Sequence, residues 1–158
     1  MRSELQRFAS AAFARELVVR VSEVLAPAGI VPMPLKGVLF QAWLYDDATE
    51  RELVDADVLV PRGRFAEAAR LLEAAGFVPR RQRMSHERSF QHPEIPLPVD
   101  LHARLFPRLR YALGVDGLFA RASLDHDLFG CPVYAPAPMD ASRTSSGTPP
   151  TTTPTNDR

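Results

Sequence analysis

Seven residues in the first half of the chain, Val54–Val60, constrain its fold more than any other segment. They read Val-Asp-Ala-Asp-Val-Leu-Val, so the pattern first alternates and then becomes continuously apolar, as a strand would. Residues two positions apart on a strand share a face. Asp55 and Asp57 are therefore expected to point to the same side of a sheet.

A pair of carboxylates on one face is difficult to accommodate. Two adjacent negative charges repel each other and resist sharing a site unless a cation lies between them. Mg²⁺ is a hard ion that binds carboxylate oxygens and substrate phosphates together. Asp55 and Asp57 thus indicate a site for a metal-bound triphosphate, although many exposed strands carry two acidic residues without any such role.

Two further motifs favour the metal site over a solvated acidic face. Upstream, a Leu-Lys-Gly motif at residues 35–37 opens a helix. A glycine there lets backbone N–H groups approach a phosphate, and the helix N-terminus favours anions. Downstream, a Val-Asp-Leu-His motif at residues 99–102 places Asp100 on a later strand with apolar neighbours. A third carboxylate from an adjacent strand would complete a two-metal site.

The spacing of apolar residues predicts the elements around these motifs. We expect helices over residues 3–27, 37–45 and 115–122, and another that starts after Pro61. The first is expected to be amphipathic, with an apolar stripe that begins at Leu5 and Phe8. We expect strands over residues 54–60, 77–84, 87–91, 99–105 and 131–134, with an edge strand or extended lead-in over residues 30–35.

The C-terminal segment differs in composition from the rest of the chain. From Pro136 onward it is rich in Pro, Ser and Thr, and such a segment cannot bury enough apolar surface to offset the entropy of ordering. We therefore expect one domain over residues 1–135 and a disordered tail over residues 136–158.

The charge of the chain bears on its binding partners, and its cysteine content and N-terminal region bear on its location in the cell. Lysine plus arginine and aspartate plus glutamate each total 19, which gives no general argument for nucleic-acid or membrane binding. Lys36 is the only lysine, and Cys131 is the only cysteine, so no intrachain disulfide can form. Charged residues interrupt the N-terminal region too often for a signal peptide or a membrane span. These features predict a cytoplasmic protein.

The order of the motifs resembles the nucleotidyltransferase superfamily of the DNA polymerase β type. It resembles more closely a family of uncharacterised nucleotidyltransferases, whose pattern runs Leu-Lys-Gly, a helix ending in Tyr, Arg-x-x-x-Asp-x-Asp-x-Leu-Val, Gly-Phe and Val-Asp-Leu-His. In this chain the matching positions are Leu35 to Gly37, Tyr45, Arg51, Asp55 to Val60, Gly76-Phe77 and Val99 to His102. The resemblance covers roughly residues 5 to 125.

The resemblance implies an α+β fold, with a mixed β-sheet flanked by helices, and a Mg²⁺-dependent reaction. A nucleoside monophosphate would pass from an NTP to a hydroxyl acceptor, with release of pyrophosphate and the help of two Mg²⁺ ions. The acceptor, whether a small molecule, a protein or an RNA, stays open. The implied site residues are the metal-binding Asp55, Asp57 and Asp100 and the phosphate-facing Lys36, Gly37 and Arg51.

Some features depart from the family pattern and keep an alternative open. Gly37 is followed by Val38, where the wider superfamily has Gly-Gly or Gly-Ser, and the low-complexity tail stands where the family continues into a helical region. The alternative is a truncated, non-catalytic nucleotide- and metal-binding remnant or an interaction module. His102 is expected to be a structural neighbour of Asp100 and not a general base.

Overall fold

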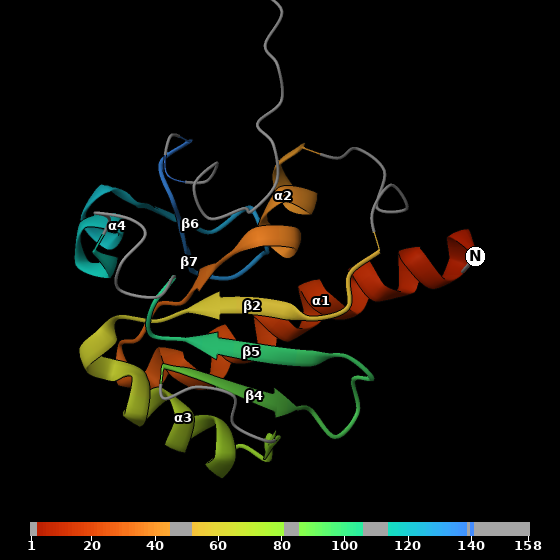
Figure 1. Cartoon of the computed structure of the whole chain (residues 1–158), viewed down its shortest axis with the longest axis horizontal. Helices are drawn as coiled ribbons and strands as arrows, with labels where there is room; N and C mark the ends of the chain where they lie inside the picture. The colour runs from red at the N-terminus through yellow and green to blue at the C-terminus, as the bar shows by residue number, and fades with distance from the viewer. Residues whose placement is uncertain (1–2, 45–51, 81–85, 106–113, 139, 141–158) are drawn as a thin grey trace, which may run out of the picture.

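The computed structural model describes residues 3–44, 52–80, 86–105, 114–138 and 140. Within these residues, helices surround a five-stranded sheet and a separate two-stranded hairpin (Figure 1). The helices are α1 (Glu4–Leu25), α2 (Lys36–Leu44), α3 (Phe65–Ala74) and α4 (Val115–Arg121), with 3-10 turns η1 (Ala26–Ala28) and η2 (Arg62–Arg64). The strands are β1 (Met33–Pro34), β2 (Ala56–Leu59), β3 (Val78–Pro79), β4 (Glu87–Gln91), β5 (Pro98–His102), β6 (Ser123–Asp125) and β7 (Val133–Ala135).

The large sheet has the strand order β1-β2-β5-β4-β3. Strands β2 and β5 run parallel, whereas the β1–β2, β5–β4 and β4–β3 pairs are antiparallel. The chain between β2 and β5 supplies α3 and the β3–β4 pair, and this long connection allows the two parallel strands to lie side by side. The expected α+β fold, with a mixed sheet flanked by helices, is confirmed.

One face of the sheet forms the main core. Val58, Phe90, Val99 and Leu101 point to this face and pack with apolar residues of α1 and α3. All four side chains are fully buried. Because side chains alternate along a strand, the residues between them lie on the opposite face, which carries the polar groups of the candidate site.

The first helix differs from its predicted pattern at its N-terminal end. Ser3 and Gln6 form a capping box, in which each side chain accepts a hydrogen bond from the other residue's backbone N–H, and this fixes the start of α1. The predicted apolar stripe is wrong at Leu5 and Phe8, which are 75% and 56% exposed. Figure 1 shows the reason: the first turns of α1 extend beyond the ends of β2 and β5.

The strand predicted over residues 87–91 is confirmed as β4, whereas the other predicted strands are shorter in the structure. The predicted strand over residues 54–60 is reduced to β2, so Asp55 lies immediately before the strand and not within it. Gly76 follows α3 with φ +96°, in the left-handed conformation expected of a residue that ends a helix. The sequence did not predict β6, because its three residues are too few to show a period of two.

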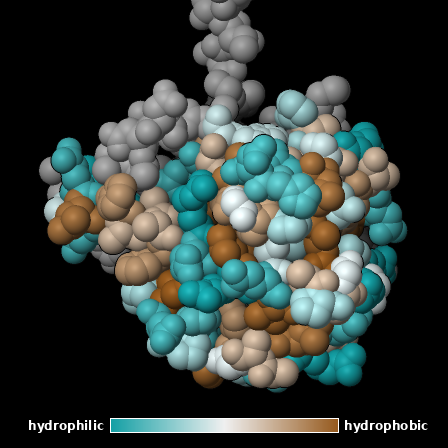
Figure 2. All heavy atoms as spheres, turned by 180° about the vertical axis from the view of Figure 1, so that it is seen from behind, coloured by the Kyte–Doolittle hydropathy of each residue, from teal (hydrophilic) through white to brown (hydrophobic). Residues whose placement is uncertain are grey.

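The surface of the molecule is mixed in character. Seen from behind, the molecule shows apolar groups interspersed with hydrophilic ones (Figure 2). In the described part of the chain, no helix combines the length and the apolar character needed to cross a membrane.

Asp140 is buried, and its Oδ2 pairs with Nε of Arg121 at 2.9 Å. The predicted domain boundary at residue 135 stays a prediction, and residues 141–158 lie outside the described part.

Candidate active site

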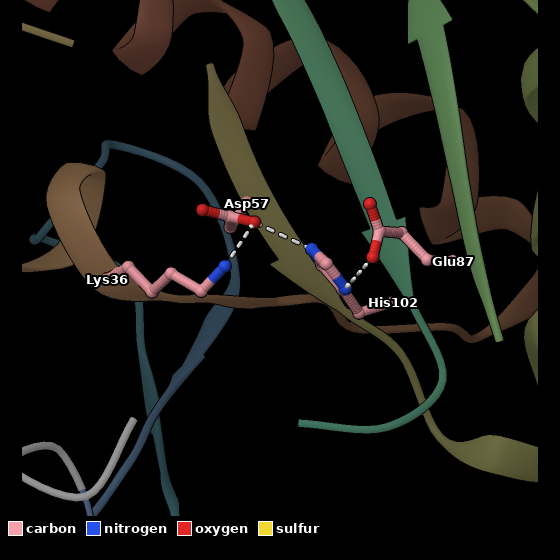
Figure 3. Close-up of polar contacts among 4 residues, drawn as sticks. All are labelled: Lys36, Asp57, Glu87 and His102. Carbon is pink, nitrogen blue, oxygen red and sulfur yellow. Dashed lines mark hydrogen bonds and ion pairs between the residues drawn. The ribbon is translucent and has the colours of Figure 1, made fainter. Parts of the chain in front are cut away.

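Asp57 lies at the centre of the polar face of the sheet. Its backbone carbonyl accepts a hydrogen bond from the N–H of Leu35 at 2.9 Å, which fixes the start of α2 beside β2. Its Oδ1 accepts hydrogen bonds from Lys36 Nζ at 2.9 Å and from His102 Nε2 at 2.6 Å (Figure 3). The side chain is only 7% exposed, so these two donors largely determine its electrostatic environment.

The register of β2 and β5 brings the predicted carboxylates together. Asp57 is the direct partner of Asp100 across the parallel strands, and Leu59 is the partner of His102. Asp100 and His102 lie two residues apart on β5 and so share the face of Asp57. His102, expected as a neighbour of Asp100, makes its hydrogen bond diagonally across the strands to Asp57.

Asp55 lies within electrostatic reach of the other two carboxylates. Burial raises the pKa of Asp55, and the negative charges of Asp57 and Asp100 raise it further. The positive charges of Lys36 and His102 act in the opposite direction but do not cancel the effect. The three aspartates predicted from the sequence thus form one electrostatic group.

The pKa of the Asp57 carboxyl shifts in the opposite direction, because two side chains donate hydrogen bonds to it. Burial alone would raise the pKa of its carboxyl, but the hydrogen bonds from His102 and Lys36 and their positive charge outweigh this effect. The net result is a lowered pKa, so the carboxyl of Asp57 is held in its ionised form more firmly than that of Asp55.

The three aspartates have the right chemistry to bind a hard divalent cation. Carboxylate oxygens are preferred ligands of Mg²⁺, and the repulsion that raises the pKa of Asp55 is the kind that a cation relieves. Within the described residues, however, no set of three or more His, Cys, Asp and Glu side chains is arranged to enclose a metal ion. Asp57 and Asp100 share a face of the sheet and Asp55 lies just before β2, but the three side chains do not form a closed cage.

Lys36 has an unusual backbone conformation at the first position of α2. Its φ is +50°, and it is the one non-glycine residue with positive φ among those described. This left-handed conformation is comfortable for glycine but costs other residues roughly 1–2 kcal/mol. The ammonium group of Lys36 forms an ion pair with Asp57, and the side chain remains 43% exposed.

Gly37 is needed for packing. A Cβ atom placed on it would lie 2.7 Å from Cδ2 of Leu53, closer than real contacts allow. Leu53 is 4% exposed and precedes the Val54-Asp55 approach to β2, so this contact brings the start of α2 close to the strand. The predicted approach of the Gly37 backbone to a phosphate stays a prediction, and Arg51 lies outside the described residues.

Glu87 lies beside the site but belongs to none of the sequence motifs that predicted it. It is the partner of His102 in the antiparallel β4–β5 register, and its Oε2 lies 3.9 Å from His102 Nδ1. The available signal was the alternation along β4, where Glu87, Ser89 and Gln91 form a polar face. That pattern becomes informative only when the pairing of β4 with β5 is known.

The fold places the chain in a known structural class. It is similar to the solved structure of the lincosamide antibiotic adenylyltransferase LnuA with lincomycin bound, with a TM-score of 0.58 and 13% identity over 82% of this chain and 84% of that chain. It is also similar to ANT(2″)-Ia in complex with adenylyl-2″-tobramycin, with a TM-score of 0.54 and 16% identity over 78% of this chain and 68% of that chain. At these identities the likeness concerns the nucleotidyltransferase fold.

The sequence assigns the family within this class. The sequence model of the uncharacterised nucleotidyltransferases matches residues 2–142. The chain belongs to this family, and is thereby a nucleotidyltransferase, as its motifs predicted. No curated protein matches the chain in sequence.

Proposed function

We propose that the chain transfers a nucleoside monophosphate from an NTP to a hydroxyl acceptor in a Mg²⁺-dependent reaction. The observation that carries this proposal is the parallel β2–β5 register, which makes Asp57 and Asp100 direct neighbours. Asp55 belongs to the same group, since its pKa is raised by burial and by both other carboxylates. Three acidic side chains that repel one another on a partly buried face have a physical reason to bind a divalent cation.

Asp55, Asp57 and Asp100 are the residues that would hold Mg²⁺. The bound ions would supply positive charge to the triphosphate and to the oxygens that enter and leave at phosphorus. Asp57 is suited to this role, because its lowered pKa keeps it ionised. Burial and the charges of its neighbours make the ionised form of Asp55 costly, so a bound cation would relieve that cost and lower its pKa.

Lys36 is proposed to neutralise charge on the triphosphate. Its ammonium is 43% exposed and is carried by a flexible stem, so it can leave Asp57 for an incoming phosphate. The strained φ of +50° supports a functional role, because glycine would occupy this backbone position without strain. A lysine at a position that glycine would occupy more easily indicates that its side chain is needed.

The proposed reaction is a displacement at the α-phosphorus of the NTP. The acceptor oxygen forms a bond to the α-phosphorus, the bond from that phosphorus to the bridging oxygen breaks, and pyrophosphate leaves. Asp100 is proposed to accept the proton of the acceptor hydroxyl. Asp100 is only partly buried, unlike Asp57, whose Oδ1 already accepts two hydrogen bonds.

The structural neighbours suggest which substrates to test first. LnuA is described as an adenylyltransferase bound to lincomycin, and ANT(2″)-Ia is described in complex with adenylyl-2″-tobramycin. We therefore propose ATP as the first donor and small polyhydroxylated antibiotics as the first acceptors. Protein side chains and RNA ends form the second group of acceptors to be tested.

Radiolabel transfer would test the proposed function. The purified chain would be incubated with Mg²⁺ and each α-³²P-labelled NTP, with lincosamides, aminoglycosides or a cell lysate as the source of acceptor. Label transferred by the wild type and lost in Asp55→Asn and Asp57→Asn variants, whose folding is checked by circular dichroism, would support the proposal. Mg²⁺-dependent NTP binding without transfer to any acceptor would favour the alternative of a non-catalytic binding module.

A further inference from the structure

His102 is held between carboxylates from two different strands. It lies on β5, with Asp57 on the neighbouring β2 and Glu87 on the neighbouring β4 (Figure 3). Nε2 is 2.6 Å from Asp57 Oδ1, and Nδ1 is 3.9 Å from Glu87 Oε2. The side chain of His102 is 9% exposed, so the imidazole has little freedom to leave this position.

The chemistry of the short contact defines which nitrogen carries a proton. A carboxylate oxygen accepts hydrogen bonds, and Oδ1 of Asp57 lies 2.6 Å from Nε2 of His102. Nε2 of His102 must therefore donate to Oδ1. The imidazole orientation then leaves Nδ1 facing Glu87.

The backbone around His102 is hydrogen-bonded on both sides of β5. The carbonyl of His102 accepts a hydrogen bond from the N–H of Val60 at 3.0 Å, and the N–H of Ala103 donates to the carbonyl of His86 at 2.8 Å. These bonds tie β5 to the segments on both of its sides. They fix the backbone position from which the imidazole reaches Asp57.

We propose that His102 is a positioning residue that orients the Asp57 carboxylate for cation binding, with Glu87 holding the opposite side of the imidazole. This inference rests on the proposed function. Figure 3 shows the second carboxylate oxygen of Asp57 on the side opposite to His102, without a contact drawn to either His102 or Lys36. A fixed Oδ1 therefore determines where Oδ2 points, and partners of this kind commonly set metal affinity through the ligand that they hold.

The same geometry argues against direct contact between His102 and the substrate. One ring nitrogen is used by Asp57 and the other faces Glu87, so both point along the sheet. The imidazole acts through Asp57 and not on the reacting atoms.

Mn²⁺ binding, followed by electron paramagnetic resonance without nucleotide, would test the role of His102. His102→Leu removes the donor and is expected to weaken Mn²⁺ binding about 10- to 100-fold. His102→Gln retains a side-chain N–H donor and is expected to recover most of the affinity. Glu87→Gln should have a smaller effect, below about 10-fold. His126→Leu, at an exposed histidine, is the matched control and should bind as the wild type does.

The outcomes separate this inference from the proposed function. Wild-type affinity in His102→Leu would overturn the positioning role and leave the metal chemistry intact. Absence of Mn²⁺ binding by the wild type would overturn the metal chemistry and, with it, this inference. A long-range ¹H–¹⁵N spectrum of the metal-free protein, with His102 assigned from the His102→Gln variant, adds an independent readout. A protonated Nε2 would support the proposed geometry, and an unprotonated Nε2 would overturn it.

Discussion

The ammonium of Lys36 lies 2.9 Å from Oδ1 of Asp57, so the first residue of α2 is joined by an ion pair to the middle of β2. In the metal-free protein this cation balances part of the negative charge of the aspartate group. A metal ion and the lysine therefore compete for the same carboxylate, whereas a triphosphate would attract the lysine away from it. Loss of the ammonium of Lys36 should therefore affect metal binding and nucleotide binding in opposite directions.

Lys36→Met should tighten metal binding and weaken nucleotide binding. Removing the ammonium frees Asp57 Oδ1 of a competing cation, so Mn²⁺ affinity without nucleotide should rise. Affinity for a non-hydrolysable ATP analogue with Mg²⁺ should fall at least about 10-fold, because a hydrogen bond to a charged group contributes roughly 1.5–3 kcal/mol. Paramagnetic resonance and calorimetry measure the two affinities.

Arg20→Met is the matched control for this substitution. Arg20 pairs with Glu16 on the surface of α1, and both side chains are about half exposed, so its loss should change neither affinity. A decrease in both affinities of Lys36→Met would contradict the competition and would indicate that the lysine mainly supports the structure of the site.

Lys36→Gly should be more stable than Lys36→Met. Both variants lose the ion pair, but only glycine adopts φ +50° without strain. The left-handed conformation costs other residues roughly 1–2 kcal/mol, and glycine loses part of that gain through its greater freedom in the unfolded chain. We expect a difference of about 0.5–1 kcal/mol in the free energy of unfolding, measured by urea denaturation. Equal stability of the two variants would show that the backbone is not strained.

Gly37→Ala should destabilise the protein through its contact with Leu53. The added methyl group would lie 2.7 Å from Cδ2 of a side chain that is 4% exposed, and such overpacking costs typically about 1–3 kcal/mol. Gly63→Ala is the control, because a Cβ there meets nothing within 4 Å. In a Leu53→Ala background the cost of Gly37→Ala should largely disappear, and additive costs would exclude the proposed contact.

The sequence predicted the residues of the site better than their relationships. The apolar context of Asp57 and Asp100 indicated two strands, and the motif order indicated that they belong to one site. The parallel pairing of β2 with β5 could not be read from local periodicity, because it depends on the intervening α3 and β3–β4 segments. Even so, this pairing is what makes the two carboxylates direct neighbours.

Residues that act through tertiary pairing were harder to predict. Glu87 carries no motif, and its relation to His102 arises only from the β4–β5 register. Similarly, the amphipathic pattern of α1 suggested that Leu5 would be buried, but the length of the sheet determines where burial begins. Periodicity predicts an apolar face, and the extent of the partner surface decides how much of that face is covered.

Asp55 and Asp57 should have opposite effects on stability as the pH changes. The folded pKa of Asp57 is lowered from its ordinary value of 3.8, so its stabilising contribution is present above that pH and is lost as the pH falls through the lowered pKa. The folded pKa of Asp55 is raised above 3.8, so ionisation of Asp55 reduces stability as the pH rises through the raised pKa. The first effect therefore lies below pH 3.8 and the second above it.

Asp55→Asn should consequently stabilise the metal-free protein at pH 7, where the wild type carries the unfavourable charge. The advantage should shrink as the pH is lowered through the raised pKa of Asp55, since the wild-type carboxyl is then neutral as well. Added Mg²⁺ should reverse the order, because a cation that binds only the folded wild type stabilises it. Urea denaturation between pH 4 and 7, with and without Mg²⁺, measures these differences against Asp127→Asn, a control at an exposed aspartate between β6 and β7. If Asp55→Asn stabilised the protein equally with and without Mg²⁺, Asp55 would have no part in cation binding.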